Sequence, residues 1–308
     1  MTTRTNERVV YFNGEIVPES QALIPYRDRG FYFGDGCFDI TRSFDGRLFF
    51  LEEHVERLYR SLGYLRIDTG IEPARMLEIT REVFERNRHL LGPHEDYWVG
   101  QRISRGVHRV AGDNWDQEGP TVIVECIPLP LKERASLYRD GIHAVTPSVR
   151  RTPPECLSPR VKSLNYLNLV MADLEVHAQN PEAWALLLDV NGNLCEGLGS
   201  NIFVIKDGVL KTPSERYVLP GVSRQKAMDF ARARGVPVEE GDIDLYDAYA
   251  ADEAFITSTS LCLCPVSKVN GKPVGNGQVF GPITQGILDD YSAHVGCDIA
   301  GQYLAHLE

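Results

Sequence analysis

Two short stretches of the chain carry residue types that could do chemistry together. Residues 160–166 place Lys162 at the start of a segment with helical apolar periodicity, and residues 195–203 place Glu196 among small residues. A lysine amine can form a Schiff base with an aldehyde, while a carboxylate can pair with the nitrogen of a flat ring that approaches the backbone. This combination of an amine and a carboxylate suggests a site for pyridoxal phosphate.

A pyridoxal phosphate site also needs fixed donors for the phosphate dianion. The free N–H groups of a helix N-terminus and the fork of an arginine are suitable donors. The sequence offers such groups at a helix start, in a hydroxyl-rich run and on an arginine, namely Val222 and Ser223, Ser258 and Thr259, and Arg57. Each has an ordinary explanation as well, because hydroxyl runs after strands are commonly loops and an arginine can form a surface ion pair. Together with the lysine and the carboxylate, they supply every part that the cofactor needs.

Turn signals and apolar periodicity predict the elements that position these residues. Asn-Gly and Asp-Gly pairs between β-rich runs predict hairpins at residues 13–14, 45–46, 191–192 and 207–208. Apolar residues at helical spacing predict helices over residues 52–65, 73–90, 163–179, 223–234 and 282–294. Further strands are expected at residues 97–104, 120–128, 253–258 and 263–268. We expect Gly63 to end the first helix and Ser223 to be the N-cap of the fourth.

Three glycines lie among aromatic residues in the run at residues 29–39. Gly30, Gly34 and Gly36 indicate a backbone that turns tightly or approaches a ligand. The alternative is a bulged strand in the core, and the sequence leaves both interpretations open.

Composition limits the class of protein. A chain of 308 residues is long enough for one large domain or two ordinary ones, and its net charge of −11 argues against binding to nucleic acid. No apolar run reaches membrane-spanning length, and residues 1–8 lack the apolar core of a signal peptide. Seven scattered cysteines favour a reduced, cytoplasmic protein without a metal site. Two prolines predict a connector at residues 127–136, between domains of residues 1–126 and 137–308.

The order of the motifs resembles that of the class IV, or fold-type IV, aminotransferases, and is similar to branched-chain and D-amino-acid aminotransferases. The family pattern has a carboxylate, an Asn-apolar-Phe run, a threonine and a Gly-apolar-x-Arg run, which are here Glu196, Asn201, Ile202, Phe203, Thr212, Gly221, Val222 and Arg224. Leu198 departs from the pattern, because the family usually has a small residue there. The resemblance covers nearly the whole chain. It implies a two-domain α+β or α/β fold, with a small N-terminal α/β domain and a larger, mixed β-barrel-like domain that binds the cofactor.

By this resemblance, Lys162 and Glu196 are the catalytic residues. Lys162 would bind pyridoxal 5'-phosphate covalently and shuttle the substrate proton, while Glu196 would pair with the pyridine nitrogen and keep it protonated. The phosphate would be held by a cation, a helix start and two hydroxyls, on Arg57, Val222, Ser223, Ser258 and Thr259. Tyr166 would hydrogen-bond the ring hydroxyl, although it follows the lysine by four residues where branched-chain enzymes place a tyrosine five residues after it.

The residues that would select the substrate give mixed signals. A substrate carboxylate needs cations, and the cationic and aromatic candidates are Phe33, Phe38, Arg42, Arg102, His108 and Arg109. Residues 38–42 resemble a stretch of the branched-chain enzymes, whereas residues 102–106 resemble (R)-selective amine transaminases. The Arg-x-His order of D-amino-acid enzymes is absent, since His108 directly precedes Arg109. The basic cluster at residues 102–109 could also be an ordinary solvated strand end.

These observations favour ping-pong transamination from a hydrophobic, branched-chain-like amino acid to a 2-oxo acid. One alternative is an (R)-selective amine or D-amino-acid transaminase. Another is a lyase similar to aminodeoxychorismate lyase, whose Lys-x-Leu-Asn pattern occurs at residues 162–165. A non-catalytic cofactor-binding protein is disfavoured, because no required residue is missing. The resemblance also implies a homodimer whose other partners are the amino donor and the 2-oxo acid acceptor.

Overall fold

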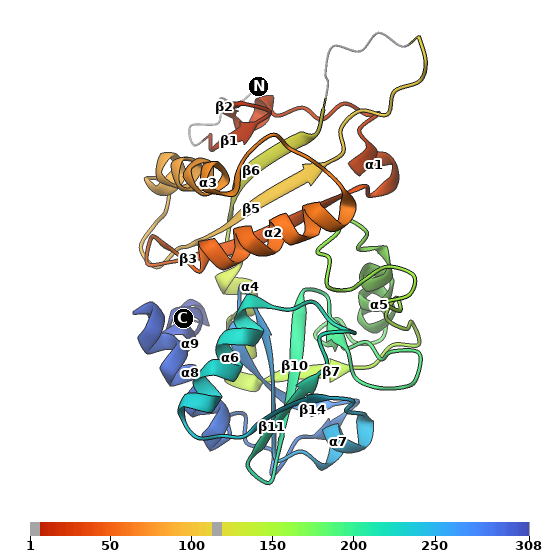
Figure 1. Cartoon of the computed structure of the whole chain (residues 1–308). Helices are drawn as coiled ribbons and strands as arrows, with labels where there is room; N and C mark the ends of the chain where they lie inside the picture. Colours follow the sequence, from red (N-terminus) through yellow and green to blue (C-terminus); the bar gives the residue numbers. More distant parts are fainter. Residues whose placement is uncertain (1–6, 113–118, 308) are drawn as a thin grey trace. The chain divides into compact units, whose positions relative to one another are not determined.

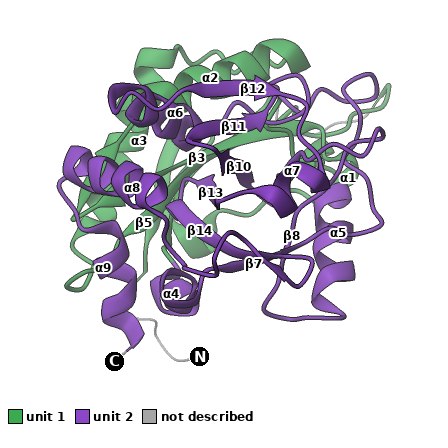
Figure 2. Ribbon diagram, turned by 90° about the horizontal axis from the view of Figure 1, so that it is seen from below, with its two compact units in different colours: residues 1–129, 161–165 green, residues 130–160, 166–308 purple. Residues whose placement is uncertain are grey.

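The chain packs into two compact units, which Figure 2 shows in different colours. The computed structural model describes residues 7–112 and 119–307. The first unit comprises Met1–Leu129 and Val161–Asn165, and the second comprises Pro130–Arg160 and Tyr166–Glu308. Val161–Asn165 therefore packs with the N-terminal unit, although it lies in the stretch of sequence that we assigned to the larger domain. The domain limits from the sequence stay a prediction.

The first unit is built on an antiparallel sheet of six strands in the order β2-β1-β6-β5-β3-β4 (Figure 1). The strands are β1 Val9–Phe12, β2 Glu15–Pro18, β3 Gly36–Phe44, β4 Arg47–Phe49, β5 Tyr97–Ser104 and β6 Thr121–Pro128. Both predicted hairpins of this unit are confirmed. Asn13 and Asp45 adopt positive φ angles of 47° and 48°, as the Asn-Gly and Asp-Gly turns require.

Two helices, α2 Leu51–Leu65 and α3 Pro73–Arg88, pack on this sheet and form its core (Figure 1). Their buried residues include Leu58, Met76 and Val83, which confirms the predicted apolar stripes. The prediction that Gly63 ends α2 is wrong. The helix continues to Arg66, which has a φ of 55°, and the N–H of Ile67 bonds to the carbonyl of Leu62. Burial of Ile67 stabilises this later end.

The glycine-rich run forms a helix and then a strand. The interpretation of residues 29–33 as a bulged strand is wrong, because they form α1 Arg29–Phe33. Asp28 caps α1 by accepting a hydrogen bond from the N–H of Gly30, and Gly34 ends it with a φ of 64°. At Gly36 a side chain has no room, since a Cβ there would lie 2.3 Å from the carbonyl oxygen of Ile103.

The second unit is built on a nine-stranded mixed sheet in the order β12-β11-β10-β13-β14-β7-β8, with β9 beside β10 and β15 beside β14. The strands are β7 Ile142–Val145, β8 Trp184–Ala185, β9 Glu196–Gly197, β10 Ser200–Lys206, β11 Val209–Pro213, β12 Val238–Gly241, β13 Glu253–Ser258, β14 Cys262–Val269 and β15 Lys272–Pro273. The helices are α4 Leu131–Asp140, α5 Leu167–His177, α6 Val222–Ala233, α7 Leu245–Ala250, α8 Pro282–Val295 and α9 Ile299–Leu304. Short 3-10 turns cover Glu19–Gln21 and Ala305–Leu307.

Helix α4 begins at Leu131, within the predicted connector, whose limits stay a prediction. Two predicted helix starts in this part of the chain need correction. Helix α5 begins at Leu167 rather than at residue 163, because the residues before it pair with β3. Ser223 is not the N-cap of α6, which is Gly221, a residue without a side chain that could cap the helix.

We predict that Gly36→Ala lowers the free energy of unfolding by about 1–3 kcal/mol, because the added methyl group must displace backbone. Gly63→Ala is the matched control. It lies inside α2, where an added Cβ meets nothing within 4 Å, and should stabilise the protein by about 0.5–1 kcal/mol. Equilibrium urea unfolding of the two variants measures both effects. Equal stability of the two variants would contradict the packing at Gly36.

Candidate active site

Lys162 is buried in the first unit and is held there through its own backbone. Its N–H donates to Ser61 Oγ at 3.2 Å, and its carbonyl accepts from the N–H of Phe38 at 2.9 Å. The Nζ atom lies 4.5 Å from the centroid of the Phe38 ring. Helix α2 and strand β3 therefore fix this lysine from two sides.

The residues after Lys162 run along the start of β3. Ser163 forms an antiparallel bridge with Cys37, and the N–H of Leu164 donates to the carbonyl of Gly36 at 2.9 Å. Asn165 Nδ2 donates to the carbonyl of Gly34 at 2.8 Å. The chain at and after the lysine is thus paired with β3 and is not helical, so Lys162 does not stand at the start of a helix as the sequence suggested.

Arg57 lies in a buried cluster with Asp39 and His54. Its Nε and Nη2 atoms donate to the two oxygens of Asp39 at 2.8 and 2.7 Å, and His54 Nδ1 lies 2.7 Å from Asp39 Oδ1. Burial alone would raise the pKa of Asp39, but the charge of Arg57 and the contact with His54 hold it far below its usual range. This two-point pairing orients the guanidinium. Arg57 is therefore buried, and the alternative of a surface ion pair is wrong.

The predicted substrate residues fall into separate groups within the first unit. Arg102 pairs with Glu125, and its Cζ atom lies 5.3 Å from the centroid of the Phe38 ring. The side chains of Lys162 and Arg102 therefore both lie beside Phe38. Arg42 is used differently. It is buried, lies 3.5 Å from Asp96 Oδ2 and stacks on Phe44, so we assign it to the interior and not to substrate binding.

His108 belongs to an aromatic group beside α1. Its ring centroid lies 5.8 Å from that of the half-exposed Phe33, and its Nδ1 atom lies 3.4 Å from Nη1 of Arg29. Arg29 and Arg105 both donate to Asp35, which they hold at a lowered pKa against the opposing effect of burial. Arg109 is exposed. The structure thus brings Phe38 and Arg102 to Lys162, and Phe33 to His108.

Glu196 is buried in the second unit, and both of its carboxylate oxygens accept hydrogen bonds. Arg151 Nε donates to Oε1 at 2.8 Å, and the N–H of Leu219 donates to Oε2 at 2.9 Å. Glu196 lies on β9, directly opposite Asn201 on β10, and Asn201 in turn lies opposite Thr257 on β13. Directly opposed residues in antiparallel strands share a face of the sheet, so these three polar residues form one row.

The start of α6 lies beside this row. Asn201 Nδ2 donates to the carbonyl of Leu219 at 3.0 Å, and a Cβ on Gly221 would lie 2.3 Å from Asn201 Oδ1. Glycine is therefore needed for this close approach. Because the N-cap Gly221 has no side chain to accept from them, the first-turn amides at Val222 and Ser223 can bind an anion. The Ser223 hydroxyl accepts a hydrogen bond from Tyr291 at 3.2 Å.

In the hydroxyl-rich run of residues 257–260, two serine hydroxyls already accept hydrogen bonds from protein groups. Ser258 Oγ accepts from the N–H of Leu261 at 3.1 Å, and Ser260 Oγ accepts from Arg134. The buried Thr257 Oγ1 has no hydrogen-bond partner among the residues that the structure describes. Such an unsatisfied buried hydroxyl is expected where a polar ligand binds. Thr259 is half-buried in the turn.

Tyr166 is the residue before α5 and packs against the small core of Leu169, Ala172 and Val176. This packing does not by itself indicate a ligand. Two residues that contact predicted site residues were not named as candidates from the sequence, namely Asp39 beside Arg57 and Arg151 beside Glu196. His54 could have been found, because it lies three residues before Arg57 on the same buried face of α2.

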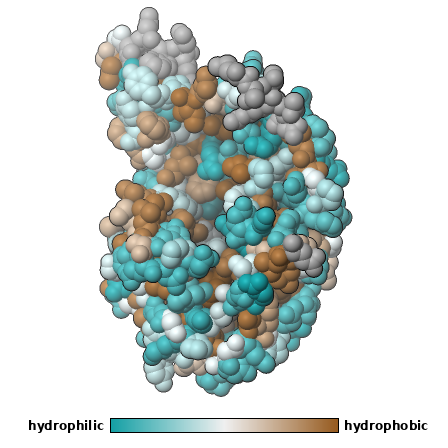
Figure 3. Space-filling model, turned by 180° about the vertical axis from the view of Figure 1, so that it is seen from behind, coloured by the Kyte–Doolittle hydropathy of each residue, from teal (hydrophilic) through white to brown (hydrophobic). Residues whose placement is uncertain are grey.

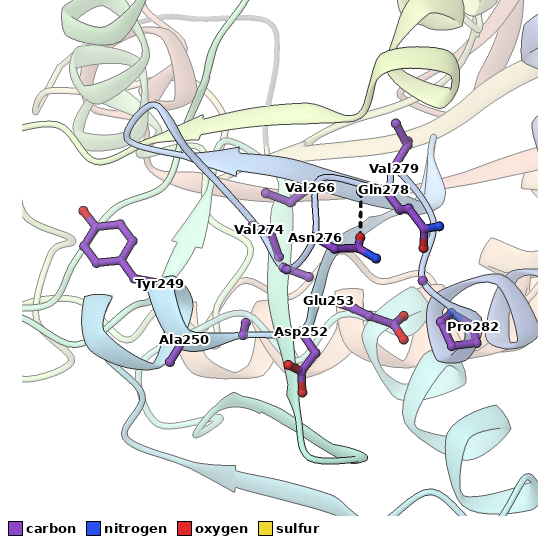
Figure 4. A pocket seen from close by; sticks show the side chains of 14 residues that line it. Tyr249, Ala250, Asp252, Glu253, Val266, Val274, Asn276, Gln278, Val279 and Pro282 are labelled. Carbon is purple, nitrogen blue, oxygen red and sulfur yellow. Dashed lines mark hydrogen bonds between the residues drawn. The ribbon is translucent and has the colours of Figure 1, made fainter.

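A separate cavity of about 540 Å³ lies in the second unit between the end of α7 and the start of α8 (Figure 4). Its wall includes Glu253, whose oxygens accept hydrogen bonds from the first-turn amides of Ile283 and Thr284. Glu253 thus caps α8, and none of the predicted site residues lines this cavity. Within residues 7–112 and 119–307, no group of three or more His, Cys, Asp or Glu could hold a metal ion. No helix in the same part of the chain could cross a membrane.

Comparison with known proteins gives a consistent picture. The family model for amino-transferase class IV matches residues 36–269. A putative branched-chain-amino-acid aminotransferase from Methanocaldococcus jannaschii is 38% identical over 283 residues, covering 92% of this chain and 94% of that protein. A D-alanine aminotransferase from Bacillus licheniformis is 30% identical, covering 90% of this chain and 94% of that protein.

A solved structure is also similar over nearly its whole length. It is the branched-chain aminotransferase of the thermophilic archaeon Thermoproteus uzoniensis with norvaline. It is 27% identical, with a TM-score of 0.83, and the alignment covers 98% of this chain and 97% of that one.

The buried His54 gives a testable pH dependence. Burial lowers its pKa from the ordinary value of 6.5, although contact with Asp39 opposes this. The unfolded chain therefore binds a proton that the native state resists, so stability falls as the pH drops below that value. We expect His54→Gln to reduce the loss of unfolding free energy between pH 7 and 5 by up to about 2 kcal/mol.

Urea unfolding at each pH measures this effect, and His89→Gln is the control, because His89 is exposed at the end of α3. The control should keep the wild-type profile. A wild-type profile in His54→Gln would show that the native state does not hold this imidazole neutral. Asp39 acts in the same direction but only at lower pH, below its ordinary value of 3.8.

Proposed function

This chain belongs to the class IV aminotransferases, and from that premise we propose that it moves the amino group of a hydrophobic, branched-chain-like amino acid to a 2-oxo acid. The choice of donor is supported by the 38% identity to the branched-chain relative. It is also supported by the Phe38 ring beside Lys162 Nζ, which offers an apolar surface next to the reacting amine.

We propose pyridoxal 5'-phosphate as the cofactor. The observation that carries this proposal is the row of Glu196, Asn201 and Thr257 beside the uncapped start of α6. In this row, Glu196 offers a carboxylate for a ring nitrogen, and Thr257 offers a buried hydroxyl without a partner among the described residues. Asn201 closely approaches Gly221 at the start of the helix. When bound, the cofactor supplies an electron-withdrawing ring that stabilises the carbanion at the donor carbon.

Each residue then has a proposed role in the reaction. Lys162 Nζ would hold the cofactor, and its amine would take the proton from Cα of the donor and deliver it to C4′ of the cofactor. Glu196 holds the proton on the ring nitrogen by charge pairing in a site shielded from water. The phosphate is bound by a cation, two first-turn amides and two hydroxyls, on Arg57, Val222, Ser223, Ser258 and Thr259. Tyr166 stays a proposed partner of the ring hydroxyl.

A D-amino-acid donor is the second candidate. It is favoured by the D-alanine aminotransferase relative, which matches 90% of the chain at 30% identity. The substrate carboxylate would then be bound by Arg102 or by His108 and Arg109. Arg102 has the support of a shared neighbour, because both Arg102 and Lys162 contact the ring of Phe38.

We expect L-leucine with 2-oxoglutarate to give the 2-oxo acid of leucine and glutamate, faster than D-alanine or (R)-1-phenylethylamine. Lys162→Ala should lose the visible absorbance of the bound cofactor and nearly all turnover. Lys132→Ala, an exposed residue of α4, is the control and should keep both. Product analysis by chromatography measures the donor preference. A preference for D-alanine would support the second candidate, and multiple-turnover release of pyruvate from aminodeoxychorismate without an acceptor would indicate a lyase.

The proposed assembly is a homodimer. Helix α5 exposes an apolar stripe with one helical periodicity, at Leu167, Val170, Met171 and Leu174. The segment around α1 also exposes large apolar side chains, including Leu23, Tyr26 and Phe31. Patches of hydrophobic residues are visible on the molecular surface (Figure 3). Exposed patches of this kind mark interaction sites.

We predict that light scattering gives the mass of a dimer for the full chain. Substituting Leu167 and Leu174, which are 71% and 57% exposed, by lysine should shift the mass toward the monomer. Tyr246→Lys is the control, because Tyr246 is 80% exposed and lies on a different helix, α7. A fully active wild-type monomer would contradict the proposal. A cytoplasmic location is also proposed, on the support of seven free cysteine thiols.

A further inference from the structure

The Glu196 carboxylate forms an ion pair with Arg151 that is largely shielded from solvent. The side chains of the two residues are only 13% and 6% exposed, and the Nε to Oε1 distance is 2.8 Å. By contrast, the pair between Arg216 and Glu155 is 64% and 63% exposed. Exposed pairs contribute little to stability, whereas removing one partner of a buried pair leaves an uncompensated charge.

The backbone around Arg151 is fixed at three successive residues. The N–H of Arg151 donates to the carbonyl of Leu188 at 2.9 Å. On either side, Asn168 Nδ2 donates to the carbonyl of Arg150 at 2.8 Å, and Asn168 Oδ1 accepts from the N–H of Thr152 at 3.0 Å. This arrangement sets the direction from which the guanidinium approaches the carboxylate.

Glu196 is anchored to the same segment of chain. The N–H of Leu187 donates to the carbonyl of Glu196 at 3.1 Å, and the N–H of Cys195 donates to the carbonyl of Leu187 at 2.9 Å. Residues 187 and 188 therefore hold the backbones of both members of the ion pair. The relative position of Arg151 and Glu196 is therefore set by backbone hydrogen bonds as well as by their side-chain conformations.

We propose that Arg151 is a positioning residue that holds the Glu196 carboxylate in the orientation to accept a hydrogen bond from the protonated nitrogen of the cofactor ring. This inference rests on the proposed function, in which Glu196 meets the cofactor ring. A carboxylate oxygen has about two acceptor sites. Arg151 occupies one site of Oε1 and the N–H of Leu219 occupies one site of Oε2, so one acceptor site on each oxygen remains. An ionised carboxylate is acceptor-only, so the ring nitrogen must be the donor.

A double-mutant cycle on cofactor affinity tests this role. The probe is pyridoxamine 5'-phosphate, which cannot form a Schiff base with Lys162 and so reports noncovalent contacts only. Its dissociation constant is measured on the full apo chain by tryptophan fluorescence, for Arg151→Met in the wild-type and in the Glu196→Gln backgrounds. We expect Arg151→Met to weaken binding about tenfold or more when Glu196 is present, as for a lost hydrogen bond to a charged group.

In the Glu196→Gln background, the same Arg151 substitution should change the dissociation constant by less than about twofold, because two residues that act through one contact are not additive. Arg150→Met is the matched control, since Arg150 is the exposed neighbour, and it should bind like the wild type. Arg151→Lys retains the cation and should restore part of the affinity. Thermal midpoints by circular dichroism confirm that each variant is folded, and the cycle with Arg151→Lys decides the question if Arg151→Met does not fold.

Two results would overturn the inference. One is an equal loss of affinity in both backgrounds, which would make Arg151 a general structural residue. The other is unchanged affinity in Arg151→Met. A wild-type chain that fails to bind pyridoxamine 5'-phosphate would instead contradict the proposed function, so the two failures are distinguishable.

Discussion

The first unit depends on the backbone pairing between residues 162–164 and the start of β3. Three hydrogen bonds or bridges, at Phe38, Cys37 and Gly36, hold a segment that comes from a distant part of the sequence. This pairing needs the glycine at position 36, where a Cβ would meet Leu164 as well as strand β5. The geometry of Lys162 is therefore set by main-chain contacts, which tolerate no sliding of register without loss of several hydrogen bonds at once.

Each unit contains a buried carboxylate that is paired with an arginine. A buried charge is costly unless it is paired and hydrogen-bonded. Asp39 is fully buried and is compensated by Arg57 and His54, and Glu196 is compensated by Arg151 and a backbone N–H. In each case the residue expected to meet the cofactor is half of an ion pair whose partner is anchored by the fold. A group held in this way needs little reorganisation when a charged ligand binds.

The sequence predicted local features well and distant pairs poorly. The hairpins at residues 13–14 and 45–46 and the helices of the first unit follow from turn residues and apolar spacing, which act over a few neighbours. The capped helix α1 was missed because its aromatic residues look like a core strand, while its stability comes from Asp28 and Gly34. Arg151 and Glu196 are 45 residues apart in the sequence, so no local pattern predicts their contact. The order of motifs indicated the family, but not these supporting residues.

The mixed substrate signals in the sequence have a structural counterpart. The candidate cations are not equivalent, because Arg42 is engaged with Asp96 and the Phe44 ring in the interior, whereas Arg102 shares Phe38 with Lys162. Both residues lie on neighbouring strands of one sheet, and only their side-chain partners separate them. A motif that lists residue types along β3 cannot record these partners. Arg102 is itself paired with Glu125, so the two arginines differ not in having a carboxylate partner but in their surroundings, because Arg42 is buried on Phe44 whereas Arg102 is partly exposed beside the ring of Phe38.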